Sequence, residues 1–342
     1  MSRRLFIIFL ITAGILCLAY LVLVSMNSQK DMYADRKDGC IGMMPIRQTN
    51  PIFVEAVPGI LFRFDTGSDI SSITESDLEK LKSMGAEVKT SVYPVMGRDG
   101  EGKTRVYMTR YTVSLPLHQY VFDTDTDDNR TEDLIQSSRN FLHNVDFAPS
   151  DAGFSVLGID FIERFKMEYQ CENNLIALYT ERPEEYVDLV ELEVSSSPLD
   201  EIWLGHRYYT DLTIDRKTDS YFLDTGLQDV QLRLPSEEKS RTRRKMNKGQ
   251  VHTLHKTFEA MIDPGAWMEI GDRVGTQTAC YYDTNEEDFA FNPLNLFNQD
   301  VLLDFGGRAI ALKPFCAVPE RTALPPDTID NLITETGAAD NN

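Results

Sequence analysis

Phe64-Asp65-Thr66-Gly67-Ser68 ends an apolar run that begins at Ile52, and a second run from Tyr208 ends in Leu223-Asp224-Thr225-Gly226-Leu227. In each copy an alternating segment, a tight turn and a second apolar segment lead directly into Asp-Thr-Gly. One Asp-Thr-Gly alone is weak evidence, because these residues often form only a solvated turn. Two copies at equivalent points of similar segments indicate an internal repeat.

A second pair of matching segments closes each copy. In the first copy Leu157-Gly158-Ile159-Asp160-Phe161 precedes two short apolar runs around a polar turn at 171–174. In the second copy Pro293-Leu294-Asn295-Leu296-Phe297 precedes two such runs around a turn at 306–308. Because the order of elements is the same in both copies, we predict an internal duplication.

The segments between these markers predict an all-β chain. Residues 104–121 and 251–261 have the composition of strands. The first copy carries one predicted helix, which Thr74 can cap and Gly85 can close. The second copy has no such helix after its Asp-Thr-Gly, and residues 228–234 read there as another strand.

The two aspartates have a clear chemical use if the copies pack about a pseudo-two-fold axis, because the two turns then face each other. Carboxylates about 3 Å apart cannot both ionise easily, so the pair holds one proton. One carboxylate can act as general base on a water while the other protonates a substrate carbonyl oxygen. Glycine allows the close approach of the backbone, and threonine can hydrogen-bond to the opposite loop.

These motifs resemble those of the pepsin-like and retropepsin-like aspartic proteases, in a single-chain form, over roughly residues 50–315. Phe64 to Ser68 matches the family's hydrophobic-Asp-Thr-Gly-Ser/Thr motif, and Val156-Leu157-Gly158 matches its hydrophobic-hydrophobic-Gly motif. The resemblance implies a two-lobed aspartic protease (acid protease) fold with pseudo-two-fold symmetry. It implies an Asp65/Asp224 catalytic dyad that hydrolyses peptide bonds as an aspartic endopeptidase. The supporting active-site loops would be Thr66, Gly67, Ser68, Thr225 and Gly226.

The resemblance also implies roles for residues around the dyad. Ser68 would hydrogen-bond the Asp65 carboxylate from outside. A flap hairpin would cover the substrate in each lobe. The first flap would have its tip in the glycine-rich turn at 97–102, with Gly97, Arg98, Asp99 and Gly100 as candidate residues, and the second flap would lie near 247–250.

The second copy departs from the family pattern at two positions. Leu227 stands where a serine or threonine is expected, and in our alignment Leu294 stands where a glycine is expected. A catalytically inactive, protease-like binding or scaffold protein at the membrane is therefore the alternative function. A homodimer that uses Asp65 twice is a third possibility, whereas the main interpretation is a monomeric catalytic domain.

Composition disfavours nucleic acid as a partner. The 342 residues include 34 basic and 54 acidic ones, a net charge of −20, which disfavours binding to nucleic acid phosphates. The expected partner is a peptide or protein substrate, with no metal or cofactor. The predicted divisions are an anchor at 1–30, a linker at 31–48, lobes at 49–198 and 199–318, and a disordered tail at 319–342.

The N-terminal segment predicts a membrane anchor. Leu5 to Val24 is a run of twenty residues without a charge, long enough to cross a bilayer as one transmembrane helix. Arg3 and Arg4 precede it, so the positive-inside rule places the rest of the chain on the extracytoplasmic (periplasmic or extracellular) side. A cleaved signal peptide is the alternative.

Four cysteines follow the anchor, namely Cys40, Cys171, Cys280 and Cys316. Two disulfides and four free buried thiols are equally compatible with the sequence. None of the four belongs to a CxxC pair, so structural zinc is not expected.

Overall fold

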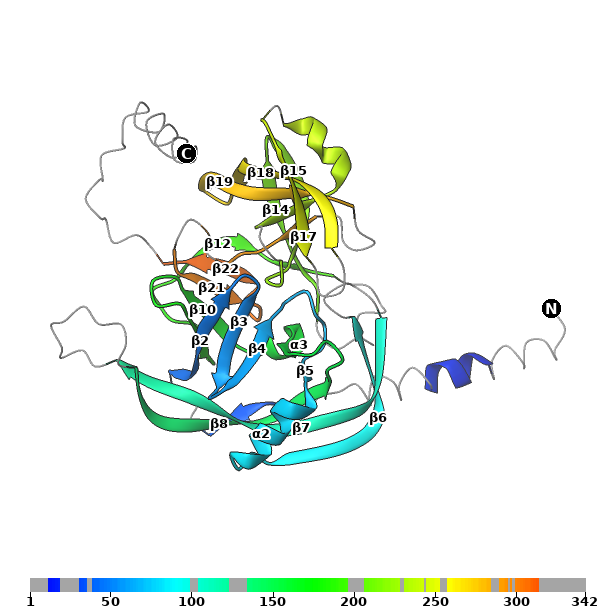
Figure 1. Ribbon diagram of the computed structural model, residues 1–342, viewed down its shortest axis with the longest axis vertical. Helices are drawn as coiled ribbons and strands as arrows, with labels where there is room; N and C mark the ends of the chain where they lie inside the picture. The colour runs from blue at the N-terminus through cyan, green and yellow to red at the C-terminus, as the bar shows by residue number, and fades with distance from the viewer. Residues whose placement is uncertain are drawn as a thin grey trace, which may run out of the picture.

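The structure is a computed structural model in which the chain is mostly β-strand, as predicted (Figure 1). It describes residues 12–18, 31–35, 39–98, 104–122, 134–195, 206–227, 231–242, 244–252, 257–283, 289–294, 296 and 299–313. We call residues 33–195 the first half and residues 206–313 the second half. The predicted tail at 319–342 lies outside the described residues.

The first half runs from a two-residue strand to the strand that leads toward the second half. Its elements are β1 (Tyr33–Ala34), β2 (Cys40–Thr49), β3 (Ile52–Val57), β4 (Ile60–Phe64), β5 (Ser72–Ile73), α2 (Glu75–Ser83), β6 (Val88–Arg98), β7 (Thr104–Phe122), β8 (Leu134–Pro149), β9 (Ser155–Leu157), α3 (Ile159–Ile162), β10 (Lys166–Gln170), β11 (Leu175–Tyr179), β12 (Val187–Glu191) and β13 (Glu193–Val194).

The second half contains one short 3-10 helix and otherwise strands. Its elements are β14 (Tyr208–Ile214), β15 (Lys217–Leu223), β16 (Leu232–Leu234), η2 (Ser236–Arg241), β17 (Asn247–His252), β18 (Thr257–Ile270), β19 (Arg273–Tyr281), β20 (Ala290–Phe291), β21 (Val301–Asp304) and β22 (Ala309–Leu312). The predicted strand at 228–234 is confirmed only for its last three residues, since 228–230 are not described.

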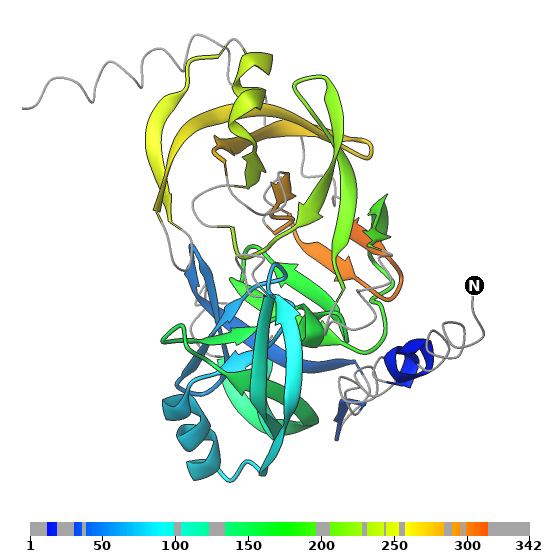
Figure 2. The ribbon, with the colours of Figure 1, turned by 90° about the vertical axis from the view of Figure 1, so that its right-hand side faces the viewer.

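Two sheets carry these strands. The larger has the order β12-β22-β21-β10-β11-β2-β3-β4-β9-β5-β8-β7-β6, and the smaller has the order β13-β14-β15-β20-β16-β19-β18-β17. The β21–β22 hairpin of the second half pairs with β10 and β12 of the first half. Figure 2 shows this hairpin, in orange, between the first-half strands below and β14 to β19 above. The halves are therefore joined by a shared sheet as well as by the chain.

Part of the predicted linker at 31–48 is wrong, because residues 40–48 form most of β2. Ile41 and Met44 on this strand are fully buried, and the strand pairs with both β11 and β3. Burial of these apolar side chains in the core of the first half outweighs the local signals of Gly42 and Pro45, which disfavour a strand.

One set of strand pairings occurs in both halves. In the first half β4 is parallel to β9, and β9 is antiparallel to β5. In the second half β15 is parallel to β20, and β20 is antiparallel to β16. β4 and β15 are the strands that lead into the two Asp-Thr-Gly turns, so the two turns leave their sheets in equivalent surroundings.

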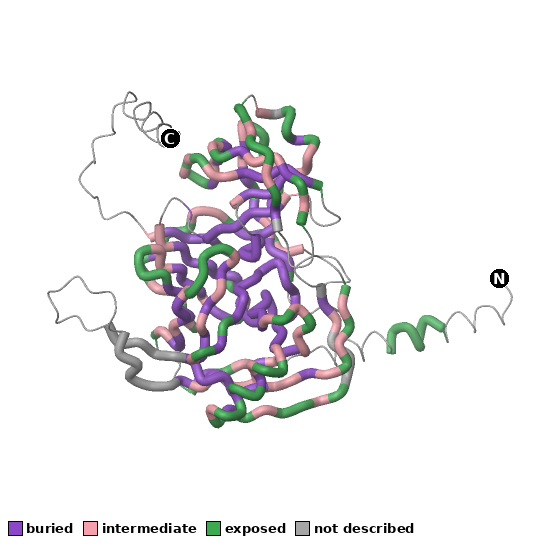
Figure 3. Tube along the Cα trace, in the orientation of Figure 1, coloured by how far each residue is buried: buried purple, intermediate pink, exposed green. Residues whose placement is uncertain are grey.

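Buried residues concentrate around these strands (Figure 3). Phe62 and Phe64 on β4 are fully buried, and so is Tyr221 on β15. Side chains on one face of a strand alternate with those on the other, so Phe62 and Phe64 face the core of the first half while Arg63 faces the opposite side. The first residues of β6, β7 and β19 are more exposed.

The predicted first-half helix is confirmed as α2. Thr74 is its N-cap and accepts a hydrogen bond from the Asp77 backbone N–H, and Gly85 follows the helix at φ +87°. Leu78 and Leu81 form its buried face.

The N-terminal segment is described only at residues 12–18, which are helical and exposed; the rest of the predicted anchor, Leu5 to Val24, lies outside the described residues. Within the part of the chain that the structure describes, no helix combines the length and apolar character needed to cross a membrane. Cys40, Cys171 and Cys280 are not in disulfides, which excludes the two-disulfide interpretation.

Two turn glycines predict a difference in stability. Gly59 and Gly271 both have positive φ, but only at Gly271 would a Cβ collide with the backbone, at the carbonyl oxygen of Leu189 on β12. We expect Gly59→Ala to cost about 1 kcal/mol, the usual penalty for alanine in a left-handed conformation. Gly271→Ala should cost about 1–3 kcal/mol more, because β12 must also shift. Urea denaturation of both variants measures the difference, and equal losses would contradict the contact with β12.

Candidate active site

The two Asp-Thr-Gly turns have matching backbone geometry. The Asp65 N–H donates to the Leu157 carbonyl at 3.0 Å, and the Asp224 N–H donates to the Phe291 carbonyl at 2.9 Å. Within each turn the glycine N–H donates to Oδ1 of the preceding aspartate at 2.9 Å, from Gly67 to Asp65 and from Gly226 to Asp224. Each carboxylate is thus held by its own turn.

The threonines join the two turns. The Thr66 N–H donates to Thr225 Oγ1 at 3.0 Å, and the Thr225 N–H donates to Thr66 Oγ1 at 2.9 Å. Each hydroxyl then donates onward to a carbonyl of the opposite strand, Thr66 to Leu223 at 3.0 Å and Thr225 to Phe64 at 3.2 Å. These four buried bonds join residues 157 to 161 positions apart in the sequence and hold the turns face to face.

The glycines show how closely the carboxylates approach. A Cβ placed on Gly67 would lie 2.8 Å from Asp224 Oδ1 and 3.0 Å from Asp65 Oδ1. A Cβ on Gly226 would lie closer still to the Asp65 carboxylate. Both turns therefore require glycine, and a single small group between them can reach both carboxylates. Asp65 and Asp224 are 1% and 6% exposed, so the pair is largely shielded from solvent.

The expected hydrogen bond from Ser68 to the Asp65 carboxylate is wrong. The Ser68 hydroxyl donates instead to the Ile70 carbonyl at 3.0 Å. The Arg63 guanidinium lies beside Asp65 Oδ2, with its Nε 3.2 Å away. Arg63 Nη2 also donates to the Gly226 carbonyl of the opposite turn at 2.7 Å. The sequence contained a signal for this residue, since Arg63 is the only charge in the apolar segment 60–64 that directly precedes Asp65.

The proposed equivalence of Leu294 and the motif glycine is also wrong. Phe64 pairs with Leu157, and Leu223 pairs with Phe291, so Asn292 is the residue that corresponds to Gly158. A Cβ on Gly158 would lie 2.7 Å from the Ser68 carbonyl oxygen, which explains the glycine in the first half. In the second half Asn292 has room for its side chain, which donates to the Thr225 carbonyl at 3.4 Å.

The other departure, Leu227, has a packing explanation. Leu227 is 8% exposed and packs with Phe222 and Ala290. It fills apolar space at the position where the first half carries the Ser68 hydroxyl. The surroundings of the two carboxylates therefore differ, although their backbone geometry matches.

The first candidate flap lies close to the first turn. Gly97 is buried, and a Cβ on it would collide with the side chain of Ile70, just after the turn. Tyr107 on the paired strand β7 packs against Ile70 and Ala148. The β6–β7 hairpin thus approaches the residues that follow Ser68; Arg98 ends β6, and Asp99 and Gly100 lie outside the described residues.

The second candidate flap, expected near 247–250, falls on a pair of antiparallel strands. These residues form the first part of strand β17, which pairs with β18, and residues 253–256 between the two strands lie outside the described residues.

A tyrosine lies near the second carboxylate. Tyr282 is 4% exposed and is hydrogen-bonded to the buried Arg233. Burial raises the pKa of the Tyr282 hydroxyl to about 12; the charge and hydrogen bond of Arg233 oppose this rise, while the charge of Asp224 adds to it. The hydroxyl is therefore neutral at and below neutral pH. Sequence reasoning missed both residues, because they are brought together by the pairing of β16 with β19.

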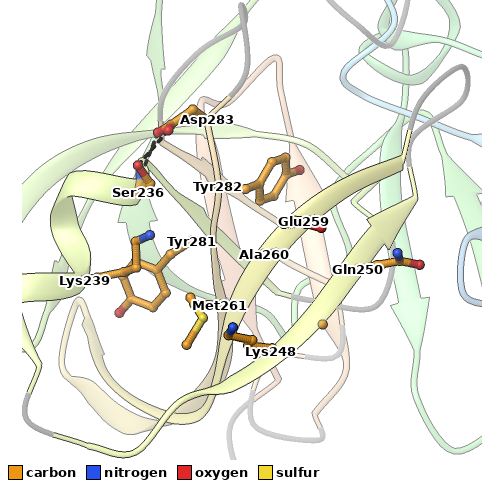
Figure 4. Close-up of a pocket in the computed structure, with 11 residues that line it drawn as sticks. Ser236, Lys239, Lys248, Gln250, Glu259, Ala260, Met261, Tyr281, Tyr282 and Asp283 are labelled. Atoms are coloured by element: carbon orange, nitrogen blue, oxygen red, sulfur yellow. Dashed lines mark hydrogen bonds between the residues drawn. The ribbon is translucent and has the colours of Figure 1, made fainter.

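A pocket of about 540 Å³ opens in the second half between η2 and strands β17 to β19 (Figure 4). Ser236 and Asp283 hydrogen-bond at its rim, and Tyr282 contributes to its wall. Among the described residues that line it, none belongs to either Asp-Thr-Gly turn. Tyr282 both lines this pocket and interacts electrostatically with Asp224.

The threonine bonds predict a loss of stability on a near-isosteric substitution. Thr66→Val or Thr225→Val leaves the N–H of the opposite threonine buried without its acceptor, at a cost of about 1–3 kcal/mol. Serine at either position should recover most of the loss, because it keeps the hydroxyl. Thr213→Val is the control, since its hydroxyl bonds only to Thr218 on an exposed surface. Denaturant unfolding measures the free energy of unfolding of each variant. Equal losses in the three valine variants would contradict the role of these bonds.

No protein-family model and no curated protein matches the chain. Among solved structures, 120 chains match, including the crystal structure of basic 7S globulin from soybean. It is 8% identical, covers 83% of this chain and 95% of its own, and has a TM-score of 0.44. This chain is thus similar to that globulin only in the general course of its backbone.

Proposed function

We propose that this chain is an aspartic endopeptidase in which Asp65 and Asp224 activate one water molecule. The observation that carries the proposal is the set of reciprocal threonine bonds, which holds the two turns so that one small group can reach both carboxylates. Two buried aspartates in this arrangement suit general acid–base hydrolysis of a peptide bond.

The chemistry needs only the two carboxylates and water. One carboxylate removes a proton from the water, and the water oxygen adds to the peptide carbonyl carbon. The other aspartate carries the proton that the pair holds, and it donates this proton to the carbonyl oxygen, which gives a neutral gem-diol. The aspartate that took the proton of the water passes it to the peptide nitrogen, and the other aspartate takes a proton back from a gem-diol hydroxyl. The C–N bond breaks, a carboxyl group and an amine leave, and the pair again holds one proton. The Gly67 and Gly226 N–H groups hold the Oδ1 atoms throughout, so the carboxylates need no reorientation.

We also propose that the two halves are the lobes of an aspartic protease fold related by a pseudo-two-fold axis. The recurring pairings of β4 with β9 and of β15 with β20 support this relation. Neither half carries both aspartates, so the lobes form one catalytic unit in a monomer. The β6–β7 hairpin, with Gly97 and Arg98 near its end, would cover an extended peptide substrate.

The alternative function is a protease-like binding or scaffold protein. Leu227 favours it, because the second half replaces a hydroxyl with an apolar side chain beside the turn. Under this alternative, the chain would bind a peptide between its two halves without cleaving it.

Substitution of the aspartates tests the proposal. Asp65→Asn and Asp224→Asn should each lower kcat/KM on an unfolded protein substrate by at least about 100-fold, because either change removes a proton acceptor or donor. Asp211→Asn is the control, since Asp211 is exposed on β14. Pepstatin should inhibit the unsubstituted chain. Peptide binding without cleavage by the unsubstituted chain between about pH 3 and 7 would establish the alternative function.

We further propose that the segment Leu5 to Val24 anchors the chain in a membrane, with both halves on the extracytoplasmic side. Its support is the length of the uncharged run after Arg3 and Arg4 and the exposure of Ile15, Leu16 and Leu18 in the described helical part.

Charges placed in this run test the anchor. Leu16→Lys combined with Leu18→Lys should release the chain from membranes, since each buried lysine costs about 2.5–3.5 kcal/mol on insertion scales. Ser25→Lys, just beyond the run, should leave it bound. Extraction of membranes with alkaline carbonate measures both, and an unsubstituted chain found wholly in the soluble fraction would exclude the anchor.

A further inference from the structure

One end of the pocket in the second half is rich in hydrogen-bond donors. Lys248 on β17 pairs with Met261 on β18, and Met261 pairs with Tyr281 on β19. Directly paired residues lie on the same face of a sheet, so these three side chains form a row across three strands. Lys239 on η2 lines the same pocket, and Figure 4 shows its side chain beside that of Tyr281. We call Lys239, Lys248 and Tyr281 the donor end.

The Tyr281 hydroxyl is the buried member of the donor end. Tyr281 is 2% exposed, and its hydroxyl has no hydrogen-bond partner among the described residues. Burial raises the pKa of this hydroxyl to about 12, with Asp263 and Asp215 adding to the rise and Arg244 opposing it. The hydroxyl is therefore neutral at and below neutral pH. A buried hydroxyl without a partner is costly, and a ligand in the pocket can supply the acceptor.

The charges around the pocket are divided between its two ends. Neither lysine of the donor end forms an ion pair with a described residue. Asp283 accepts the Ser236 hydroxyl at 2.6 Å and the Ser236 N–H at 2.9 Å, one on each oxygen. These two bonds lower the pKa of Asp283 most, and the charge of Lys239 adds a smaller part. Glu259 lies opposite Gln250, away from the donor end (Figure 4). The donor end thus presents two ammonium groups to a ligand.

The pocket adjoins a strand edge that suits an extended peptide. β18 pairs with β19 from Met261 onward, whereas among the described strands its residues 258–260 pair with β17 alone. Tyr282 follows β19 at this point, and its ring centroid lies 5.3 Å from that of Phe258. Tyr282 also interacts electrostatically with Asp224. A peptide that extends from the dyad past Tyr282 can therefore reach the donor end.

We propose that the donor end binds a carboxylate group of such a peptide and gives the chain a preference for peptides that carry one there. Two ammonium groups and a neutral hydroxyl are all donors, and a carboxylate offers acceptor oxygens with the opposite charge. The carboxylate belongs to an Asp or Glu side chain or to the C-terminus of the peptide. The net charge of −20 opposes a general attraction of acidic peptides, so the preference comes from these local groups. Its kinetic consequence rests on the proposed peptidase function, whereas the binding itself does not.

Binding of matched peptides tests the site without any need for cleavage. The probes are fluorescent peptides of about ten residues with one Glu at each position in turn, each compared with Gln at the same position, and each made with a free and an amidated C-terminus. On the full chain with Asp65→Asn, at least one Glu or one free C-terminus should tighten binding by about 10-fold. Dependence on Glu identifies a side chain as the source, and dependence on the free end identifies the C-terminus. Equal binding of every matched pair, or no binding at all, would overturn the proposal.

Substitutions at the donor end test which residues are responsible. Lys248→Met should remove most of the preference. Tyr281→Phe should lower it by about 3-fold with an unchanged urea midpoint, because the hydroxyl that is lost has no partner among the described residues. Lys245→Met is the matched control, since Lys245 is exposed, carries the same charge and does not line the pocket. An equal loss of preference in Lys245→Met and Lys248→Met would assign it to general charge and refute the site.

Cleavage of the same peptides separates this inference from the proposed function. With the dyad unsubstituted, kcat/KM should be about 10-fold higher for the preferred peptide than for its neutral partner, and Lys248→Met should bring this ratio close to one. Cleavage without any such ratio would leave the peptidase standing and overturn the site. Carboxylate-dependent binding by a chain that cuts none of the peptides would refute the peptidase and keep the site.

Discussion

The reciprocal bonds between Thr66 and Thr225 are the constraint on which the rest of the candidate site depends. Each threonine hydroxyl makes two hydrogen bonds: it accepts one from the backbone N–H of the opposite threonine and donates one to a backbone carbonyl of the opposite strand. Two aspartates brought together in a buried space repel each other, so something must hold them there. The threonine bonds and the shared sheet of β10, β12, β21 and β22 supply that restraint from two sides.

A symmetric backbone here carries unequal side chains. The turn bonds match within a few tenths of an ångström in the two halves. Around Asp65 the structure places Arg63 and a serine that bonds to its own loop, while around Asp224 it places an apolar leucine, Asn292 and the Tyr282–Arg233 pair. The backbone geometry therefore places the two carboxylates symmetrically, whereas the side chains around them give each carboxylate a different environment.

Features with local causes could be predicted from the sequence. The cap at Thr74 and the two strand–turn units depend on residues within a few positions of one another. Features with distant causes could not. β2 contains Gly42 and Pro45, and its partner β11 lies more than a hundred residues away. The contact of Arg63 with Gly226 requires the second half to be in place.

The error at Leu294 has the same origin. Pro293 to Phe297 resembles the first-half motif in composition, but register is set by strand pairing, and the pairing of Leu223 with Phe291 makes Asn292 the equivalent of Gly158. A shift of two residues keeps the same side-chain alternation along a strand, so the apolar pattern alone cannot reveal it.

The early start of ordered structure limits how far the proposed peptidase can reach. β1 begins at Tyr33, and β2 runs through the middle of the larger sheet rather than along its edge. If the membrane-spanning segment ends at Val24, fewer than ten residues connect it to β1, and even a fully extended connection of that length spans at most about 30 Å. Such a connection keeps β1 within about 30 Å of the bilayer. The accessible substrates would then be chains that emerge from the membrane or lie along it, and proteins in the surrounding bulk solution would be reached only when they approach that surface.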